Sequence, residues 1–142
     1  MDVQRYRKDH AWILRQFEAL RELTHAGVRD HAADISRLLM TISGRIKLHL
    51  AAEEEFLYPS LVHSGDSAAA ALGKRYEQEM QGMAATFVAF VKDWWTPAKL
   101  EHDPEGFQRS ANTVLKALFE RIKRENVELY PVVEKLHEHV SA

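Results

Sequence analysis

The chain has 142 residues, a formal net charge of −2, and 46% hydrophobic against 28% charged residues. This balance excludes intrinsic disorder, which requires low hydrophobicity and high net charge, and the length is that of one domain, residues 1–142. No apolar run approaches the roughly 20 residues that a bilayer span needs, so no membrane partner is expected. The near-neutral charge predicts no nucleic-acid partner, because such proteins carry a concentrated basic face.

The sequence contains no cysteine and 8 histidines. Disulfides, zinc–thiolate sites, iron–sulfur clusters and cysteine nucleophiles are therefore excluded. A metal would be held by nitrogen and oxygen ligands, for which the histidines are an ample supply. The first residues, MDVQRYRKDHAW, contain no apolar secretory segment, so we expect a cytoplasmic location.

Two helices are predicted in the first half of the chain. The first runs from about Val3 to Ala26, where Gly27 ends it. Its apolar residues recur at helical spacing: Val3, Tyr6, Ile13, Leu14, Phe17 and Leu20. The second begins near Asp30, and its inward-facing residues alternate steps of four and three: Ile35, Leu39, Ile42, Ile46, His49, Glu53 and Phe56.

Two more helices are predicted in the second half. The third follows a turn with Asp66 or Ser67 as N-cap, and Thr96 and Pro97 end it. Its inward-facing residues are Leu72, Tyr76, Glu79 or Met80, Met83, Phe87, Phe90 and Trp94. A polar loop then leads to Asp103, the N-cap of the fourth helix. The inward-facing residues of that helix are Phe107, Ala111, Val114, Leu118, Arg121, Glu125 and Glu128 or Leu129.

The C-terminal segment completes the expected fold. Pro131 predicts a kink, and the apolar residues after it predict a short closing helix. No stretch alternates with period two for long enough to indicate a strand. The fold class is therefore all-α, an up-down-up-down four-helix bundle with a short extra C-terminal helix.

Five polar residues occupy positions where the bundle core should be apolar. These are His10, His49, Glu53, Arg121 and Glu125, and the helical spacing brings them to one level of the interior. A buried charge without a partner costs at least several kcal/mol. These side chains therefore require compensation by a metal, by an internal ion network, or by both.

An internal repeat relates two of these segments. Residues 49–59 read HLAAEEEFLYP and residues 121–131 read RIKRENVELYP. Glutamate, leucine, tyrosine and proline recur at identical offsets, with Arg121 where the first copy has His49. The repeat relates Glu53 to Glu125 as equivalent carboxylates of two half-bundles.

The early histidine, the HxxxEExxLYP segment and its repeat resemble the hemerythrin-like, or HHE cation-binding, domain family over nearly the whole chain. The resemblance implies a four-helix bundle that holds two irons with histidines and two bridging carboxylates. Members of that family carry or sense oxygen, or handle iron, nitric oxide or peroxide. Position by position, His10, His49, Glu53 and Glu125 match family ligands.

The departures from the family pattern are concentrated at one metal position. Met80 stands where the resemblance implies a histidine of the third helix, and Arg121 replaces the histidine of the fourth. In the family these two positions serve mainly one of the two irons. We infer that Arg121 reaches between Glu53 and Glu125 and supplies the charge of the missing ion. Glu79 is a weaker candidate, as a further oxygen ligand or as a partner of Arg121.

The expected function is that of a hemerythrin-like protein with a reduced, mononuclear site for oxygen, nitric oxide or redox handling. One iron per chain is expected rather than two, with Mn or Zn as alternatives, and a small diatomic ligand or redox species is the expected partner. The alternative is a metal-free bundle with a Glu53–Arg121–Glu125 ion network and a binding or structural role. No general acid or base is assignable, so enzymatic activity stays open. Trp94 and Trp95 cannot both face inward, which is compatible with a homodimer contact.

Overall fold

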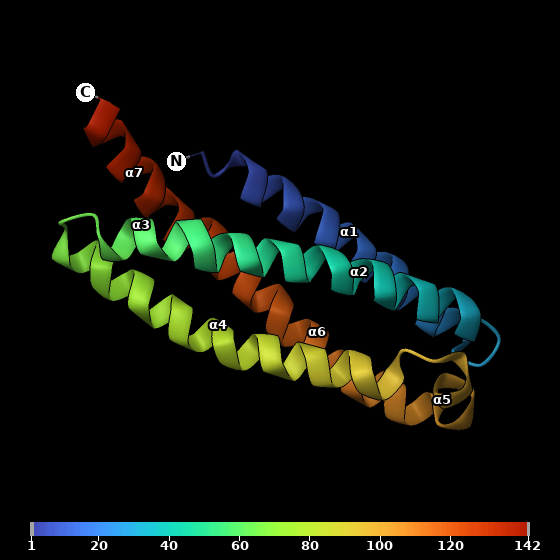
Figure 1. Ribbon diagram of the computed structural model, residues 1–142. Coiled ribbons are helices and arrows are strands. Elements are labelled where there is room, and N and C mark those ends of the chain that lie inside the picture. Colours follow the sequence, from blue (N-terminus) through green and yellow to red (C-terminus); the bar gives the residue numbers. More distant parts are fainter. Residues whose placement is uncertain (1, 142) are drawn as a thin grey trace.

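The computed structural model describes the backbone of residues 2–141, with side chains through residue 137, as an antiparallel four-helix bundle (Figure 1). The long helices are α1 (Gln4–Gly27), α2 (Ala32–Ala52), α4 (Ser67–Trp94) and α6 (Pro104–Arg124). Each long helix contacts the next along the chain, and α6 also contacts α1, so the four close into a ring. Within residues 2–141 there is no strand, which confirms the all-α prediction.

Shorter helical elements extend the long ones. These are the π-helical turns η1 (Glu53–Leu57) and η2 (Glu125–Leu129) and the α-helices α3 (Tyr58–Val62), α5 (Pro97–His102) and α7 (Tyr130–Ser141). The chain passes from α2 through η1 into α3, and from α6 through η2 into α7, without leaving the helical conformation. The predicted C-terminal helix is therefore present as a direct continuation of α6 (Figure 1).

Each π turn lies immediately before a Tyr-Pro pair. Proline has no N–H, and its ring crowds the carbonyl four residues back, which disfavours the regular α-helical turn. The backbone N–H of Tyr58 instead donates to the carbonyl of Glu53, five residues back, and Tyr130 donates in the same way to Glu125. The sequence repeat is thus also a structural repeat, and each π turn begins at a glutamate of the predicted site.

Side-chain caps begin the helices of the second half. Asp66 accepts a hydrogen bond from the N–H of Ala69 at 3.0 Å, and Asp103 accepts one from Gly106 at 2.9 Å, as predicted for these two caps.

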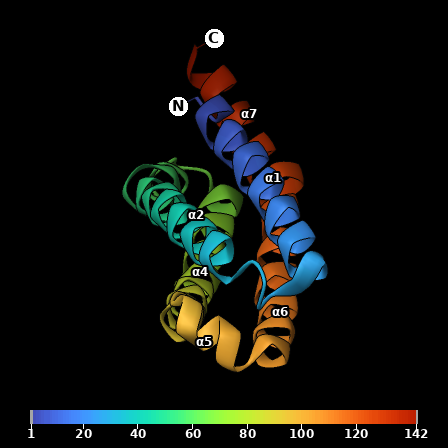
Figure 2. The same cartoon turned by 90° about the vertical axis from the view of Figure 1, so that its right-hand side faces the viewer.

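The prediction of a polar loop after Pro97 was wrong, because this segment forms the short helix α5. Thr96 caps it by accepting from the N–H of Lys99, and Pro97 takes the first helical position, where proline is favoured. The fully buried Leu100 then holds α5 in the core. Figure 2 shows α5 crossing the end of the bundle between α4 and α6.

The interior contains two apolar clusters. One includes Ile13, Ile46 and Leu118, and the other includes Tyr6 and Leu129. Along each contributing helix, the buried polar residues of the predicted site lie in sequence between members of the first cluster and members of the second. The predicted site therefore forms a polar layer between two apolar halves.

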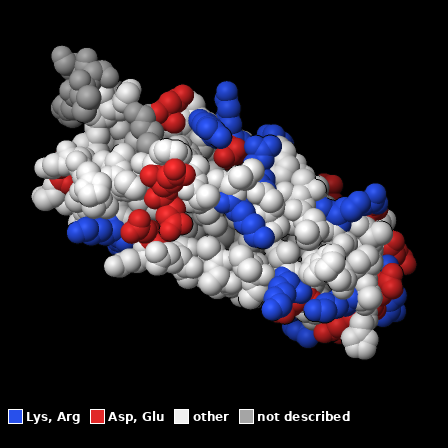
Figure 3. Space-filling view, in the orientation of Figure 1, with Lys and Arg blue, Asp and Glu red and all other residues white. Residues whose placement is uncertain are grey.

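The surface carries charges of both signs. On the face shown in Figure 3, lysine and arginine side chains are interspersed with aspartate and glutamate, and a broad area is uncharged. None of the described helices is both long and apolar enough to cross a membrane. Trp95 is 45% exposed, whereas the Trp94 ring packs edge-on against Phe107, which confirms that only one of the two faces inward.

The close approach of α3 to α4 depends on a glycine. A Cβ at Gly73 would lie 2.9 Å from the Cβ of the fully buried Leu61, whereas a Cβ at Gly82, in the same helix, would meet nothing within 4 Å. We expect Gly73→Ala to lower the free energy of unfolding by about 1–3 kcal/mol through overpacking. The control Gly82→Ala should raise it by about 0.5–1 kcal/mol, because alanine restricts the unfolded chain. Urea unfolding measures both, and equal stabilisation by the two variants would contradict the packing argument.

Candidate metal centre

Four buried side chains, each from a different helical element, meet in the polar layer. They are His10 of α1, His49 of α2, Glu53 at the start of η1 and Glu125 at the start of η2. Each is at most 4% exposed, and one ligand atom from each lies within 4.8 Å of all the others. The structure thus brings together the four residues that the sequence indicated as metal ligands.

The distances among these atoms suit a shared ion. His10 Nε2 lies 3.0 Å from His49 Nε2 and 3.2 Å from Glu125 Oε1, and His49 Nε2 lies 3.2 Å from Glu53 Oε1. Ligand atoms placed 2.0–2.2 Å from one metal ion are separated from each other by about 3.0–3.5 Å. The cluster therefore has nearly the spacing of a coordination sphere.

Hydrogen bonds orient both imidazoles. His49 Nδ1 lies 3.1 Å from the Asp9 carboxylate, and His10 Nδ1 lies 2.8 Å from the side-chain oxygen of Asn126. An oxygen acceptor keeps the proton on Nδ1, so the lone pair of each Nε2 faces the centre of the cluster. Two lone pairs therefore face each other beside two carboxylates, an arrangement that requires a cation or protons between them.

Two tyrosines of the repeat border the carboxylates. The hydroxyl of Tyr130 donates to Glu53 at 3.0 Å and lies 3.1 Å from His10 Nε2. Burial, with the charges of Glu53 and Glu125, raises the pKa of Tyr130 and of Tyr58, so both phenols stay neutral. The buried hydroxyl of Tyr58 and one oxygen each of Glu53 and Glu125 have no hydrogen-bond partner among the described residues. These orphaned atoms fit a site that is completed by a bound group.

Burial also changes the acidity of the two glutamates. It raises the pKa of Glu53 to about 7, although hydrogen bonds with Glu125 and Tyr130 act in the opposite direction. Burial and then the charge of Glu53 raise the pKa of Glu125 to about 7, against a hydrogen bond from His10. The metal-free pair therefore retains protons near neutral pH, and a metal would have to displace them.

Arg121 does not bridge the two glutamates, contrary to the inference from the sequence. The buried guanidinium forms an ion pair with Glu79 and donates to the carbonyl of Tyr76 at 2.8 Å, both on α4. The hydrogen bond from Arg121 lowers the pKa of Glu79, so this exposed carboxylate is fully ionised. The guanidinium therefore pairs with a carboxylate at the surface rather than with the two buried carboxyls.

Glu79 thereby takes the second of its two predicted roles, as a partner of Arg121. It lies outside the group of four that could hold a metal. Arg124 adds a second contact to Glu79 at 3.5 Å, and both guanidinium groups lie over the ring of Tyr76. Permanent positive charge thus occupies the α4 side of the centre, where Met80 is buried as well.

A small cavity adjoins the centre. It has a volume of about 20 Å³, and its wall includes His10, His49, Arg121 and Met80 together with the apolar ring of Phe17. A cavity of at least about 10–15 Å³ is needed for one water molecule. The space is therefore sufficient for one water or one diatomic molecule beside the two imidazoles.

Sequence reasoning missed the two residues that orient the histidines. Asp9 lies beside the apolar face of α1 rather than on it, so helical periodicity did not indicate an inward role. Asn126 stands at the offset where the first copy of the repeat has Glu54, and this difference was the available signal. Both are partly buried polar residues adjacent in sequence to a ligand candidate.

The raised pKa values of Glu53 and Glu125 predict a pH dependence of the metal-free protein. Both exceed the ordinary 4.5, so the folded chain binds more protons than the unfolded chain between these values. The free energy of unfolding should therefore fall as pH rises from about 5 to 7.5, on the order of 3 kcal/mol for one carboxyl.

Urea unfolding in the presence of a chelator tests this dependence. Glu53→Gln cannot ionise and should show a smaller loss of stability than the wild type over the same pH range. The exposed Glu54→Gln serves as the matched control and should behave as the wild type. An equal loss in Glu53→Gln and the wild type would contradict the assignment of the protons to this pair.

Comparison with known proteins agrees with this geometry. A family model described as Hemerythrin HHE cation binding domain matches residues 1–133. Neither the comparison with curated proteins nor that with solved structures found a match. Because the family match covers nearly the whole chain and includes all four residues of the cluster, the chain belongs to the hemerythrin family of HHE cation-binding domains.

Proposed function

We propose that this chain binds one divalent metal ion, with iron as the expected ion, and uses it to bind a small diatomic molecule or a redox species. The observation that carries the proposal is the convergence of two imidazole lone pairs and two carboxylates. His10 Nε2 and His49 Nε2 lie 3.0 Å apart, each 3.2 Å from a glutamate oxygen. A divalent cation neutralises this cluster more completely than protons do.

The ligand set indicates the class of metal. Two imidazoles with two carboxylates suit Fe(II), Mn(II) or Zn(II), and the absence of cysteine from the sequence excludes thiolate ligands. When bound, iron would supply a coordination position for a small ligand and the capacity for electron transfer. The protein supplies the orientation: Asp9 and Asn126 hold the imidazoles, and Tyr130 holds Glu53.

The α4 side of the centre supports one ion rather than two. A second ion would need ligands from α4 and from position 121, where the family has histidines. Here Met80 is buried and has no nitrogen or carboxylate ligand, and Arg121 is a permanent cation held by Glu79. A second divalent ion beside this guanidinium would be repelled.

The cavity supports a small ligand. Its volume of about 20 Å³ leaves no space for an organic substrate, and its wall combines both imidazoles with apolar side chains such as Ile13 and Phe17. Oxygen and nitric oxide have the required size and polarity.

The metal-free alternative required an ion network in which Arg121 joins Glu53 and Glu125. The hydrogen bonds of Arg121 go to Glu79 and to the carbonyl of Tyr76 instead. One oxygen of each buried glutamate is left without a hydrogen bond. This arrangement favours the metal-binding proposal over a purely structural role.

Metal titration tests the proposal. Under anaerobic conditions Fe(II) should raise the thermal unfolding midpoint, because a ligand of the folded state alone contributes about 2.7 kcal/mol at a hundredfold excess over its Kd. Elemental analysis should find one iron per chain. His49→Ala should abolish the rise of the unfolding midpoint on addition of Fe(II), whereas a variant at an exposed histidine, His63→Ala, should retain it. Two irons per chain, or an unchanged rise of the unfolding midpoint in His49→Ala, would contradict the proposal of a mononuclear site.

Asp9 offers a test of imidazole orientation. Asp9→Asn retains the shape of the side chain but removes the charge beside His49 Nδ1, so we expect metal affinity to fall by about 10–100-fold. Asp34→Asn is the matched control, because Asp34 also faces a histidine, His31, at the surface and 4.0 Å away. Competition with a chromogenic chelator measures both affinities, and equal values for the two variants would exclude a role for Asp9.

A further inference from the structure

A groove between α1 and α6 lies outside the metal centre. Its volume is about 490 Å³, within the range of about 300–1,000 Å³ that is typical of small-molecule sites. Its floor includes the buried Phe17, Leu20 and Ala111. The groove is therefore a second candidate binding site, distinct in size and location from the small cavity.

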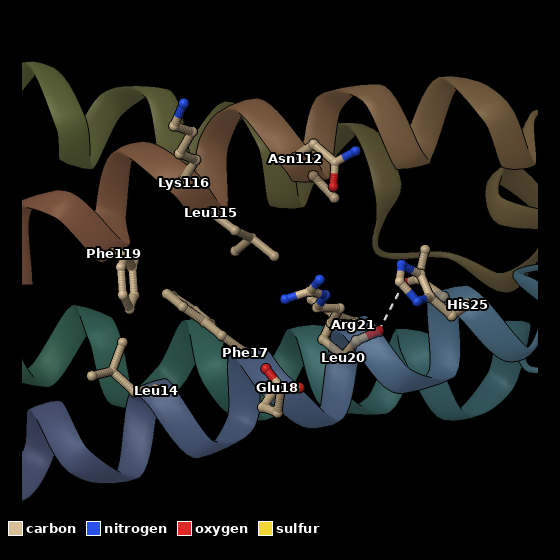
Figure 4. A pocket seen from close by; sticks show the side chains of 12 residues that line it. Leu14, Phe17, Glu18, Leu20, Arg21, His25, Asn112, Leu115, Lys116 and Phe119 are labelled. Carbon is tan, nitrogen blue, oxygen red and sulfur yellow. Dashed lines mark hydrogen bonds between the residues drawn. The ribbon is translucent and has the colours of Figure 1, made fainter.

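The two ends of the groove differ in polarity. Figure 4 shows Leu14, Phe17 and Phe119 gathered at one end, and Arg21 and His25 toward the other. Phe119 is 43% exposed, so an aromatic face is available to a ligand at the apolar end. The Thr24 hydroxyl at the polar end is already bonded to the Leu20 carbonyl at 2.8 Å, which leaves Arg21, His25 and the Asn112 amide as polar groups available there.

The charged groups favour an anion. Arg21 on α1 lines one wall and forms no ion pair or hydrogen bond with another described residue, whereas the Lys116 ammonium on α6 points away from the groove near its apolar end (Figure 4). Glu18 is the one acid among the lining residues, so fixed positive charge exceeds negative charge there. An unpaired guanidinium beside the apolar part of the groove is complementary to a ligand that has one anionic group and one apolar part.

We propose that the α1–α6 groove binds a small amphipathic anion, a carboxylate or sulfonate that carries an alkyl or aryl tail. The head group pairs with Arg21 at the polar end of the groove. The tail lies against Phe17 and Phe119. Phe17 also lines the small cavity at the metal centre, so this ring forms part of the wall of both spaces.

The proposal does not depend on a bound metal and is tested on the metal-free protein. Anilinonaphthalene sulfonate serves as the fluorescent probe, and decanoate serves as the competitor. We expect saturable binding of one probe per chain, displacement by decanoate, and no displacement by decylamine at equal concentration. Amide NMR shift changes should be concentrated in residues 14–25 and 111–119.

Charge-reversal variants decide the role of the head group. Arg21→Glu should weaken probe binding by about fivefold or more, because an attraction becomes a repulsion. Arg15→Glu, at another exposed arginine of α1 outside the groove, is the matched control and should bind as the wild type. Arg21→Ala is a second variant, should Arg21→Glu fail to fold. Unchanged affinity in folded Arg21→Glu or Arg21→Ala, or equal competition by decylamine, would overturn the proposal.

Discussion

Placing two carboxylates and two imidazoles inside an apolar bundle is the constraint on which the rest of this structure depends. Burial alone would make His10, His49, Glu53 and Glu125 strongly destabilising, so each must be compensated. The compensation is local: Asp9 and Asn126 orient the imidazoles, and Tyr130 donates to a glutamate. What these contacts leave unsatisfied is one oxygen on each glutamate beside two imidazole lone pairs, a set of donors that a divalent cation recognises.

The π turns set the register of the residues that follow the two glutamates. A regular α-helix advances each residue by a fixed angle, so a proline that interrupts the hydrogen-bond pattern shifts the register of the following turn. Both interruptions occur at the same distance before a proline, and both begin at a glutamate. The Tyr-Pro pairs therefore shape the site as well as the bundle, since they widen the turn that carries each carboxylate and place Tyr130 beside Glu53.

Helical periodicity predicts which faces are buried, and for this reason it placed all five polar residues in the interior, whereas the family resemblance distinguished the four ligand candidates from Arg121. Periodicity could not predict the direction of a long side chain. Arg121 lies on the inward face as expected, yet its guanidinium extends to Glu79 on α4 instead of between the glutamates. Periodicity did not indicate Asp9 and Asn126, because these residues border the apolar face. It did not indicate α5 either, because Thr96 and Pro97, which end α4, also begin the next helix.

The repeat of η1 and η2 gives the protein an almost symmetrical frame around an asymmetric interior. One half carries a histidine and the other an arginine at the equivalent position, although the turns that follow have the same geometry. Such a frame lets substitution alter the chemistry of one half while the backbone of both is retained. In the present chain the two halves keep the same turns while one carries an imidazole and the other a permanent charge.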